Sequence, residues 1–236
     1  MIRRLYCRKP RSDIAAQVLD FKMMLNPNDN VESQLLFCPH LYDWREIAFL
    51  REQLRQGDTF LDAGANVGFY SLIVSNLVGA KGTVLSVEAD PDNASRLRTN
   101  LQLSGIKNVQ VVNTGLSNAS ETLRLGLNTS GNRGGHSFLY DGPDAVDVEC
   151  KPLCEVLASK GIHKIDGAKF DIEGFEFRVL NRFFQEAASG LWPRFIIIED
   201  NAFFSGRTGG NVIELLNGRG YRLRQIDELN YFATLE

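Results

Sequence analysis

A short segment near position 62 carries the residue types of a nucleoside-binding turn. Its acidic, small and amide residues stand at every second position, as Asp62, Gly64, Asn66 and Gly68. An apolar run at residues 59–61 precedes them and helical spacing follows, which predicts a buried strand, a tight turn and a helix start. Glycine lets the backbone approach a ligand closely, and Asn66 can cap the helix. We therefore expect a helix N-terminus that faces an open crevice.

A second acidic residue, Glu88, ends the next predicted strand. An apolar run at residues 82–87 comes directly before it. A carboxylate at this strand end can accept hydrogen bonds from two ribose hydroxyls. Together with the turn, Glu88 predicts a βαβ unit that binds a nucleoside.

The turn distinguishes between two common nucleoside cofactors. A pyrophosphate is bound by G-x-G-x-x-G, with free backbone amides and no nearby anion. This sequence has a different spacing and places the Asp62 carboxylate at the strand end, where it repels phosphate. A carboxylate in a low-dielectric crevice instead favours the ammonium and sulfonium groups of S-adenosylmethionine. The turn therefore favours this cofactor over a nicotinamide dinucleotide.

A second cluster of charged residues lies at the end of a predicted strand at residues 165–171. Lys169 and Asp171 share one face of that strand because side chains alternate with a period of two, and Glu173 follows at once. Glu199 ends another predicted strand, and open α/β sheets bind ligands at such carboxyl ends. Asp171, Glu173 and Glu199 are therefore candidate general bases. The alternative is an ion-pair network that only holds the loop, and for Lys169 the two interpretations are equally supported.

Residues 115–150 form an excursion that interrupts the alternation of strands and helices. Short strands are predicted at 123–127 and 146–150, around a glycine-rich stretch. The tip, residues 132–137, carries His136, and loops of this composition often contact substrate. We expect His136 to reach over the crevice as a further candidate base, because histidine exchanges protons near neutral pH. A hairpin without contact to substrate is an equally supported alternative.

Hydrophobic periodicity predicts the remaining elements. Residues 25–42 are predicted as a loop with one short strand, and a helix at 43–56 is predicted to begin with a capping box formed by Asp43 and Glu46. The other predicted elements are strands at 109–112 and 194–199, helices at 91–105, 152–159, 175–187 and 211–217, and a terminal antiparallel pair at 221–223 and 231–233. Alternation of this kind is typical of an α/β fold.

Length, composition and charge limit the class of protein. With 236 residues and 44% hydrophobic content, we expect a single domain, in which residues 1–56 are an N-terminal segment with a capping helix and residues 57–236 are the main domain. A net charge of −3 gives no electrostatic argument for nucleic acid as a partner. Four cysteines are too few for a disulfide framework, and we find no apolar run typical of a signal peptide or membrane span. We therefore expect a cytoplasmic protein.

Three motifs carry a resemblance to a known family. They are Asp62-x-Gly64-Ala65-Asn66-x-Gly68, Glu88-x-x-Pro91, and Lys169-x-Asp171-x-Glu173-Gly174-x-Glu176. Over roughly residues 42–200 the sequence resembles the FkbM family of S-adenosylmethionine-dependent methyltransferases. The resemblance implies a seven-stranded Rossmann-like sheet with helices on both faces, completed by the terminal antiparallel hairpin. It also implies the activity of an O-methyltransferase.

The resemblance assigns roles to individual residues. It places the methionine part of the cofactor at the turn, on Asp62, Gly64, Asn66 and Gly68. It places the ribose at Glu88 and the adenine near Asn113 and Ser117. The sequence departs from the family after Glu199, where Asp200 and Asn201 stand and family members more often have a histidine. The acceptor chemistry is therefore less well supported than cofactor binding.

Several alternatives remain open at this point. The acceptor implied by the resemblance is a small molecule, a sugar or glycan, or a polyketide-like compound with a free hydroxyl. Magnesium on Asp171, Asp200 and Asn201, as in catechol-type enzymes, is a less favoured addition. The alternative functions are a nicotinamide-dependent Rossmann oxidoreductase, which leaves Asp62 unexplained, and a non-catalytic protein that retains the fold.

Overall fold

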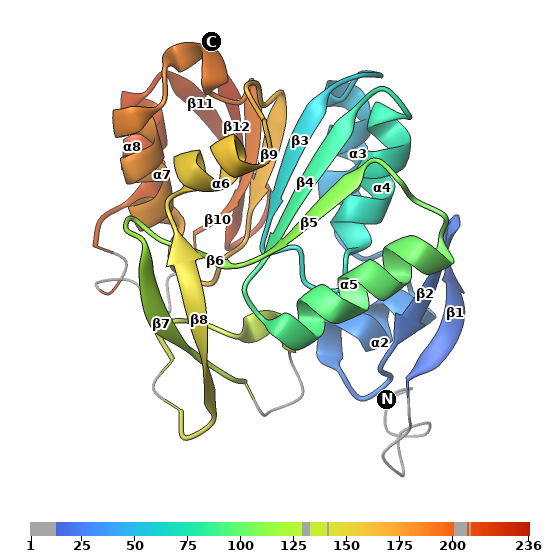
Figure 1. Cartoon of the computed structure of the whole chain (residues 1–236). Coiled ribbons are helices and arrows are strands. Elements are labelled where there is room, and N and C mark those ends of the chain that lie inside the picture. Colours follow the sequence, from blue (N-terminus) through green and yellow to red (C-terminus); the bar gives the residue numbers. More distant parts are fainter. Residues whose placement is uncertain (1–12, 129–132, 141, 201–206, 208) are drawn as a thin grey trace.

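A mixed sheet forms the centre of the computed structural model, which describes residues 13–128, 133–140, 142–200, 207 and 209–236 (Figure 1). Its seven strands lie in the spatial order β11 (Tyr221–Gln225), β12 (Asn230–Leu235), β10 (Phe195–Glu199), β9 (Gly167–Phe170), β3 (Thr59–Ala63), β4 (Thr83–Glu88) and β5 (Val109–Asn113). β12 is antiparallel to both of its neighbours, and the other pairs are parallel. The predicted Rossmann-like sheet with a terminal hairpin is confirmed.

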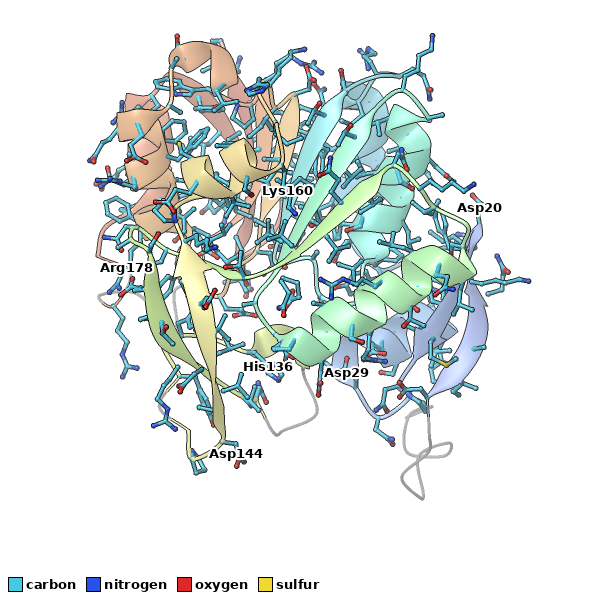
Figure 2. The ribbon with its side chains drawn as sticks, viewed as in Figure 1. Asp20, Asp29, His136, Asp144, Lys160 and Arg178 are labelled. Atoms are coloured by element: carbon cyan, nitrogen blue, oxygen red, sulfur yellow. The ribbon has the colours of Figure 1, made fainter. Side chains whose placement is uncertain are left out.

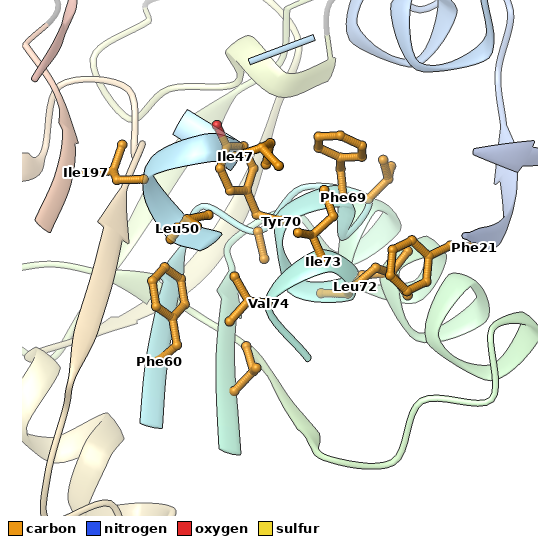
Figure 3. Packing of buried hydrophobic residues seen from close by; sticks show 14 of the residues in the cluster. Phe21, Ile47, Leu50, Phe60, Phe69, Tyr70, Leu72, Ile73, Val74 and Ile197 are labelled. Carbon is orange, nitrogen blue, oxygen red and sulfur yellow. The ribbon is translucent and has the colours of Figure 1, made fainter. Parts of the chain in front are cut away.

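Alternating side chains of the strands bury against two layers of helices. Phe60 of β3 belongs to one apolar cluster and its neighbour Leu61 to another. The first cluster contains residues of α3 (Trp44–Gln53), α4 (Phe69–Val78) and α5 (Pro91–Leu103), and the second contains residues of α6 (Leu153–Ser159), α7 (Glu176–Glu186) and α8 (Val212–Gly218). Figure 3 shows Leu50 of α3 and Val74 of α4 packed near Phe60. Helices therefore cover both faces, as predicted, and the strand ends stay accessible at one edge.

The N-terminal part is more ordered than the sequence predicted. A hairpin of β1 (Ile14–Val18) and β2 (Phe21–Leu25) precedes α2 (Asn30–Phe37), so the prediction of a loop with one short strand over 25–42 was wrong. The helix forms because the Asp29 side chain accepts a hydrogen bond from the Glu32 amide at 3.0 Å and because Leu35 is buried. β2 and α2 contribute to the same apolar cluster as α3, α4 and α5.

Two predicted helix caps do not form. Asp43 precedes α3 in a left-handed conformation with φ of 45° and makes no cap bond, because its carboxylate accepts a hydrogen bond from the Tyr70 hydroxyl at 2.8 Å. The capping box with Glu46 was therefore wrong. Asn66 also has a left-handed φ of 48°, and the residue before α4 is Gly68. The prediction of Asn66 as the cap of that helix was wrong as well.

The excursion between β5 and α6 forms its own small sheet. Its strands are β6 (Gly115–Leu116), β7 (Glu121–Gly126) and β8 (Ala145–Lys151), with β8 in the middle and antiparallel to β7. The predicted pair of strands is confirmed, and β6 is an addition to it. The short helix η1 (Arg133–Gly135) lies at the tip, and η2 (Ser189–Leu191) follows α7. Figure 1 shows the excursion extending toward the beginning of α5.

A helix that crosses a bilayer needs about 20 consecutive, mostly apolar residues. In the ranges described above, no helix is both long and apolar enough to cross a membrane.

Candidate active site

A cavity of about 810 Å³, counted with its open mouth, lies at the carboxyl ends of β3, β4 and β9. Its wall includes Gly64, Asn66, Glu88, Asp171 and Glu173 from the strand ends, Val31 and Tyr42 from the N-terminal part, and His136 and Phe138 from the excursion. Half of the sequence-predicted residues thus line one space. Those that do not line it are Asp62, Gly68, Asn113, Ser117, Lys169 and Glu199.

Gly64 allows the turn after β3 to pack directly against the end of β9. Its φ is +83°, and a Cβ atom at this position would lie 1.8 Å from the backbone carbonyl oxygen of Asp171. Only glycine fits such a contact without a shift of one backbone segment. Gly68 does not line the cavity, and its small size instead accommodates Leu97 of α5.

Four backbone amides of the turn donate hydrogen bonds inside the protein. The amides of Gly64 and Ala65 donate to the Val87 carbonyl oxygen at 2.9 and 3.1 Å. The Asn66 amide donates to Glu88 Oε2 at 2.7 Å, and the Gly68 amide donates to the Ala65 carbonyl oxygen at 2.8 Å. These four amides are therefore unavailable to a pyrophosphate.

Two hydrogen-bond acceptor atoms near the turn, by contrast, have no partner among the described residues. Within the described part of the chain, Oδ1 of Asp62 and Oδ1 of Asn66 are buried and have no hydrogen-bond partner. The other carboxyl oxygen of Asp62 accepts a hydrogen bond from the Ser71 hydroxyl at 2.5 Å. Burial raises the pKa of Asp62, and the nearby Lys169 and this hydrogen bond oppose that rise. The turn can therefore satisfy a ligand that donates hydrogen bonds, such as an ammonium group.

Glu88 lies in the wall between the turn and the beginning of α5. Its carboxyl oxygens accept hydrogen bonds from the amides of Asn66 at 2.7 Å and Asp90 at 2.9 Å. Burial raises the pKa of Glu88 to about 7, although both amide bonds favour the ionised form. Its charge therefore changes close to neutral pH.

Lys169 is a buried cation held between carboxylates. Its Nζ atom lies 2.7 Å from Asp171 Oδ2 and 4.7 Å from the centre of the Tyr70 ring. In the sheet, Lys169 also stands opposite Asp62 of β3. Burial opposes its charge, but Asp171 and Asp62 outweigh burial and raise the pKa of Lys169. Burial likewise disfavours ionised Asp171, but Lys169 outweighs it and lowers the pKa of Asp171, so the pair is ionic at neutral pH.

Three carboxyl groups meet beside this ion pair. Oxygens of Asp171, Glu173 and Glu199 all lie within 4.8 Å of one another. Burial, together with the charges of Asp171 and Glu173, raises the pKa of Glu199 to about 10. Glu199 is therefore neutral at pH 7 and donates a hydrogen bond to ionised Asp171.

The magnesium hypothesis named a different set of residues. Asp200 is not among the three clustered acids, and its amide donates to the Leu229 carbonyl oxygen at 2.8 Å. Asn201 lies outside the described residues. The acids that the structure gathers around Asp171 are thus Glu173 and Glu199.

Asn113 and Ser117 do not line the cavity. Asn113 Nδ2 donates to the Glu88 carbonyl oxygen at 2.8 Å, and the Ser117 hydroxyl donates to Glu121 at 2.6 Å. The adenine was expected near residues 113–117, and within that range Thr114 and Leu116 line the cavity.

Other wall residues were not predicted at all. Val31 and Tyr42 come from a region that the sequence predicted as a loop, and no motif marks them. Phe138 comes from the tip of the excursion, where its ring centre lies 5.1 Å from that of Phe175. Asn132 and the side chain of Arg133, which belong to the same predicted tip, lie outside the described part.

His136 contacts a different side of the cavity from the carboxyl cluster. Its Nδ1 atom lies 2.7 Å from Asp90 Oδ2, at the N-terminus of α5. Figure 2 labels His136 close to the beginning of this helix. The sequence-based hypothesis placed His136 with the candidate bases, whereas its bond to Asp90 links it to the side of the cavity that carries Glu88.

Comparisons with known proteins agree with this architecture. A family model described as the methyltransferase FkbM domain matches residues 62–223. A methyltransferase named sdnD from Sordaria araneosa is 32% identical, with 61% of this chain and 65% of that protein covered. Protein-L-isoaspartate O-methyltransferase 2 from Archaeoglobus fulgidus is 33% identical over 34% of this chain, and the match spans only 35% of that relative. The structure of a putative O-methyltransferase from Klebsiella pneumoniae has a TM-score of 0.53 at 16% identity, covering 84% of this chain and 82% of that one.

Proposed function

Because the chain belongs to the FkbM methyltransferase family, we propose that it transfers a methyl group from S-adenosylmethionine to a hydroxyl oxygen of a small molecule, sugar or glycan. The observation that carries the choice of cofactor is the hydrogen-bonding balance of the turn. Its amides are used within the protein, and its remaining buried groups are acceptors on Asp62 and Asn66. This balance suits a cationic amino-acid end and opposes a pyrophosphate.

The wall residues can be matched to the parts of this cofactor. Asp62 and Asn66 would accept hydrogen bonds from its ammonium group, and Glu88 would accept them from the ribose hydroxyls. Thr114 and Leu116 replace Asn113 and Ser117 beside the adenine, because they line the cavity. S-adenosylmethionine supplies an electrophilic methyl group when it is bound.

Asp171 is the residue we propose as the proton acceptor for the reacting hydroxyl. It lines the cavity and stays ionised because Lys169 holds it at 2.7 Å. Glu199 is protonated and donates to Asp171, so it orients the base and does not act as one. His136 bonds through Nδ1 to Asp90, on the side of the cavity that carries Glu88, so we place it with the cofactor and not with the reacting hydroxyl. The site must also hold the reacting hydroxyl in line with the methyl group.

The charge of the wall supports a neutral hydroxyl acceptor. Asp171 and Glu173 line one side of the cavity, Glu199 lies beside them, and Lys169 already pairs with Asp171. An isoaspartate or another carboxylate acceptor would add a negative charge there, and a nucleic acid would add several. A hydroxyl brings no charge and donates to a carboxylate. The proposal therefore differs from the substrate named for the Archaeoglobus relative.

S-adenosylhomocysteine should bind the protein and raise its melting temperature, whereas NAD should do neither. The reason is the shortage of amide donors in the turn and the presence of Asp62. Isothermal titration with each ligand measures this difference. Binding of NAD would support the oxidoreductase alternative, and binding of neither ligand would support the non-catalytic alternative. Transfer of labelled methyl groups from S-adenosylmethionine to hydroxylated acceptors, with and without chelator, then tests the reaction and the magnesium hypothesis.

The affinity for S-adenosylhomocysteine should increase with pH around neutrality. Burial raises the pKa of Glu88 to about 7, and the ionised carboxylate is the better acceptor for ribose hydroxyls. Affinity should rise about tenfold from pH 6 to pH 8 and then level off. Glu88→Ala should weaken binding by about 1.5–3 kcal/mol at pH 8 and remove the pH dependence. Exposed Glu149 provides the control, since Glu149→Ala should leave the titration unchanged. A wild-type affinity that is constant over this range would place the ribose elsewhere.

A further inference from the structure

Two adjacent residues of the excursion bond to opposite sides of the cavity. His136 Nδ1 lies 2.7 Å from Asp90 Oδ2, directly after β4. The Ser137 hydroxyl donates to the Glu173 carbonyl oxygen at 2.7 Å, directly after β9. In the sheet, β3 lies between β4 and β9. The pair therefore spans the turn that follows β3.

Both bonds are largely shielded from solvent. The side chains of His136 and Asp90 are 10% and 8% exposed, and Ser137 is 1% exposed. Asp90 uses its other oxygen to cap α5, where it accepts from the Asp92 amide at 2.7 Å. The Ser137 oxygen also accepts from the Leu139 amide at 3.0 Å. Asp90 is thus held in place by α5, and the Ser137 hydroxyl is held by its own segment.

The segment between and beside these anchors forms part of the cavity wall. Gly134, His136 and Phe138 all line it, and Phe138 packs against Phe175 of the loop before α7. The backbone of Ser137 is bonded in turn to Gly126 of β7. Movement of residues 134–138 would therefore open the side of the cavity that Glu88, Ala89 and Asn93 line.

We propose that His136 and Ser137 are positioning residues that clamp the excursion across the cofactor cavity and set the rate of cofactor exchange. This inference rests on the proposed function, since it takes the nucleoside cofactor as the occupant. Neither bond uses an atom of the cofactor. Loss of either hydrogen bond would let the cofactor enter and leave the cavity more easily. The association rate constant and the dissociation rate constant would therefore rise together. A residue that only contacts the cofactor would change mainly the dissociation rate constant.

Surface plasmon resonance with S-adenosylhomocysteine as the probe tests the clamp. The variants are His136→Gln, Ser137→Ala and the double variant, each compared with the wild-type full chain. His163→Gln and Ser120→Ala change exposed residues of the same types and serve as matched controls. Each single clamp variant should raise both rate constants about tenfold, the size expected for loss of a buried hydrogen bond. Unchanged rate constants, or a rise in dissociation alone, would overturn the clamp.

Hydrogen exchange provides a second measurement that does not depend on the ligand. The amides of Ser137 and Leu139 should exchange faster in the clamp variants, while amides of β3 keep their wild-type rates. If the wild-type protein bound no S-adenosylhomocysteine, the proposed function would fail, and this measurement would still decide the clamp. Unchanged exchange at Ser137 and Leu139, or equal acceleration in β3, would contradict it.

Discussion

Gly64→Ala should weaken S-adenosylhomocysteine binding by more than about 100-fold and lower the free energy of unfolding by about 2–4 kcal/mol. The added Cβ would lie 1.8 Å from the Asp171 carbonyl oxygen, and the residue would keep an unfavourable φ of +83°. The atom in the way belongs to the backbone, so no side-chain rotation relieves the contact. The turn and the end of β9 must separate, which moves Asp62 away from Lys169. Calorimetry and urea unfolding measure the two effects.

Gly57→Ala is the matched control for this substitution. Gly57 has a similar φ of +92°, but a Cβ atom there would meet nothing within 4 Å. The variant should lose about 1 kcal/mol of stability from its backbone conformation alone and keep the wild-type affinity. If Gly64→Ala behaved like Gly57→Ala, the close contact between the two loops would have no functional role.

Lys169→Met should destabilise the protein by about 3–5 kcal/mol at pH 7. Methionine has nearly the same length as the lysine stem but leaves Asp62 and Asp171 buried without their cation. Without Lys169 the pKa of Asp62 rises further in the folded state, and the pKa of Asp171, which Lys169 lowers, rises as well, because the cation that opposed burial is gone. The folded variant then takes up protons more readily than the unfolded chain, so its deficit should shrink as the pH falls from 7 to 5. Urea unfolding at both pH values measures this change.

Lys164→Met is the control for the loss of an ion pair. Lys164 pairs with Asp166 at 2.5 Å, but its side chain is 68% exposed. Exposed pairs contribute less than about 1 kcal/mol, so this variant should be nearly as stable as the wild type. A loss below 1 kcal/mol for Lys169→Met would show that Asp62 and Asp171 do not depend on the buried cation.

The sequence predicted the fold well because the fold depends on local patterns. The strand at β3, the turn around Gly64 and the strand ending at Glu88 are each contiguous, and side-chain alternation and glycine spacing report directly on them. The terminal hairpin was predicted for the same reason. Helix caps were predicted less well, because Asp43 has a competing partner, Tyr70, that no local pattern identifies.

The candidate site also combines features that the sequence predicted with features that only the structure shows. Its acidic residues were found from their positions at strand ends, but their roles depended on neighbours from other segments. Glu199 carries a proton because Asp171 and Glu173 lie beside it, and His136 bonds to Asp90 across the cavity. Thr114 and Leu116 line the cavity, whereas the side chains of Asn113 and Ser117 donate to Glu88 and Glu121.

The sequence by itself therefore determined the nucleoside-binding turn, the order of strands and helices, and the identity of most charged wall residues. Each of these follows from residues that are neighbours in the chain. The tertiary structure decided which carboxyl group is ionised, which cation supports it, and which segments close the cavity. The physical reason is that burial and Coulomb interactions depend on distances between β3, β4, β9 and the excursion, and the sheet order sets those distances.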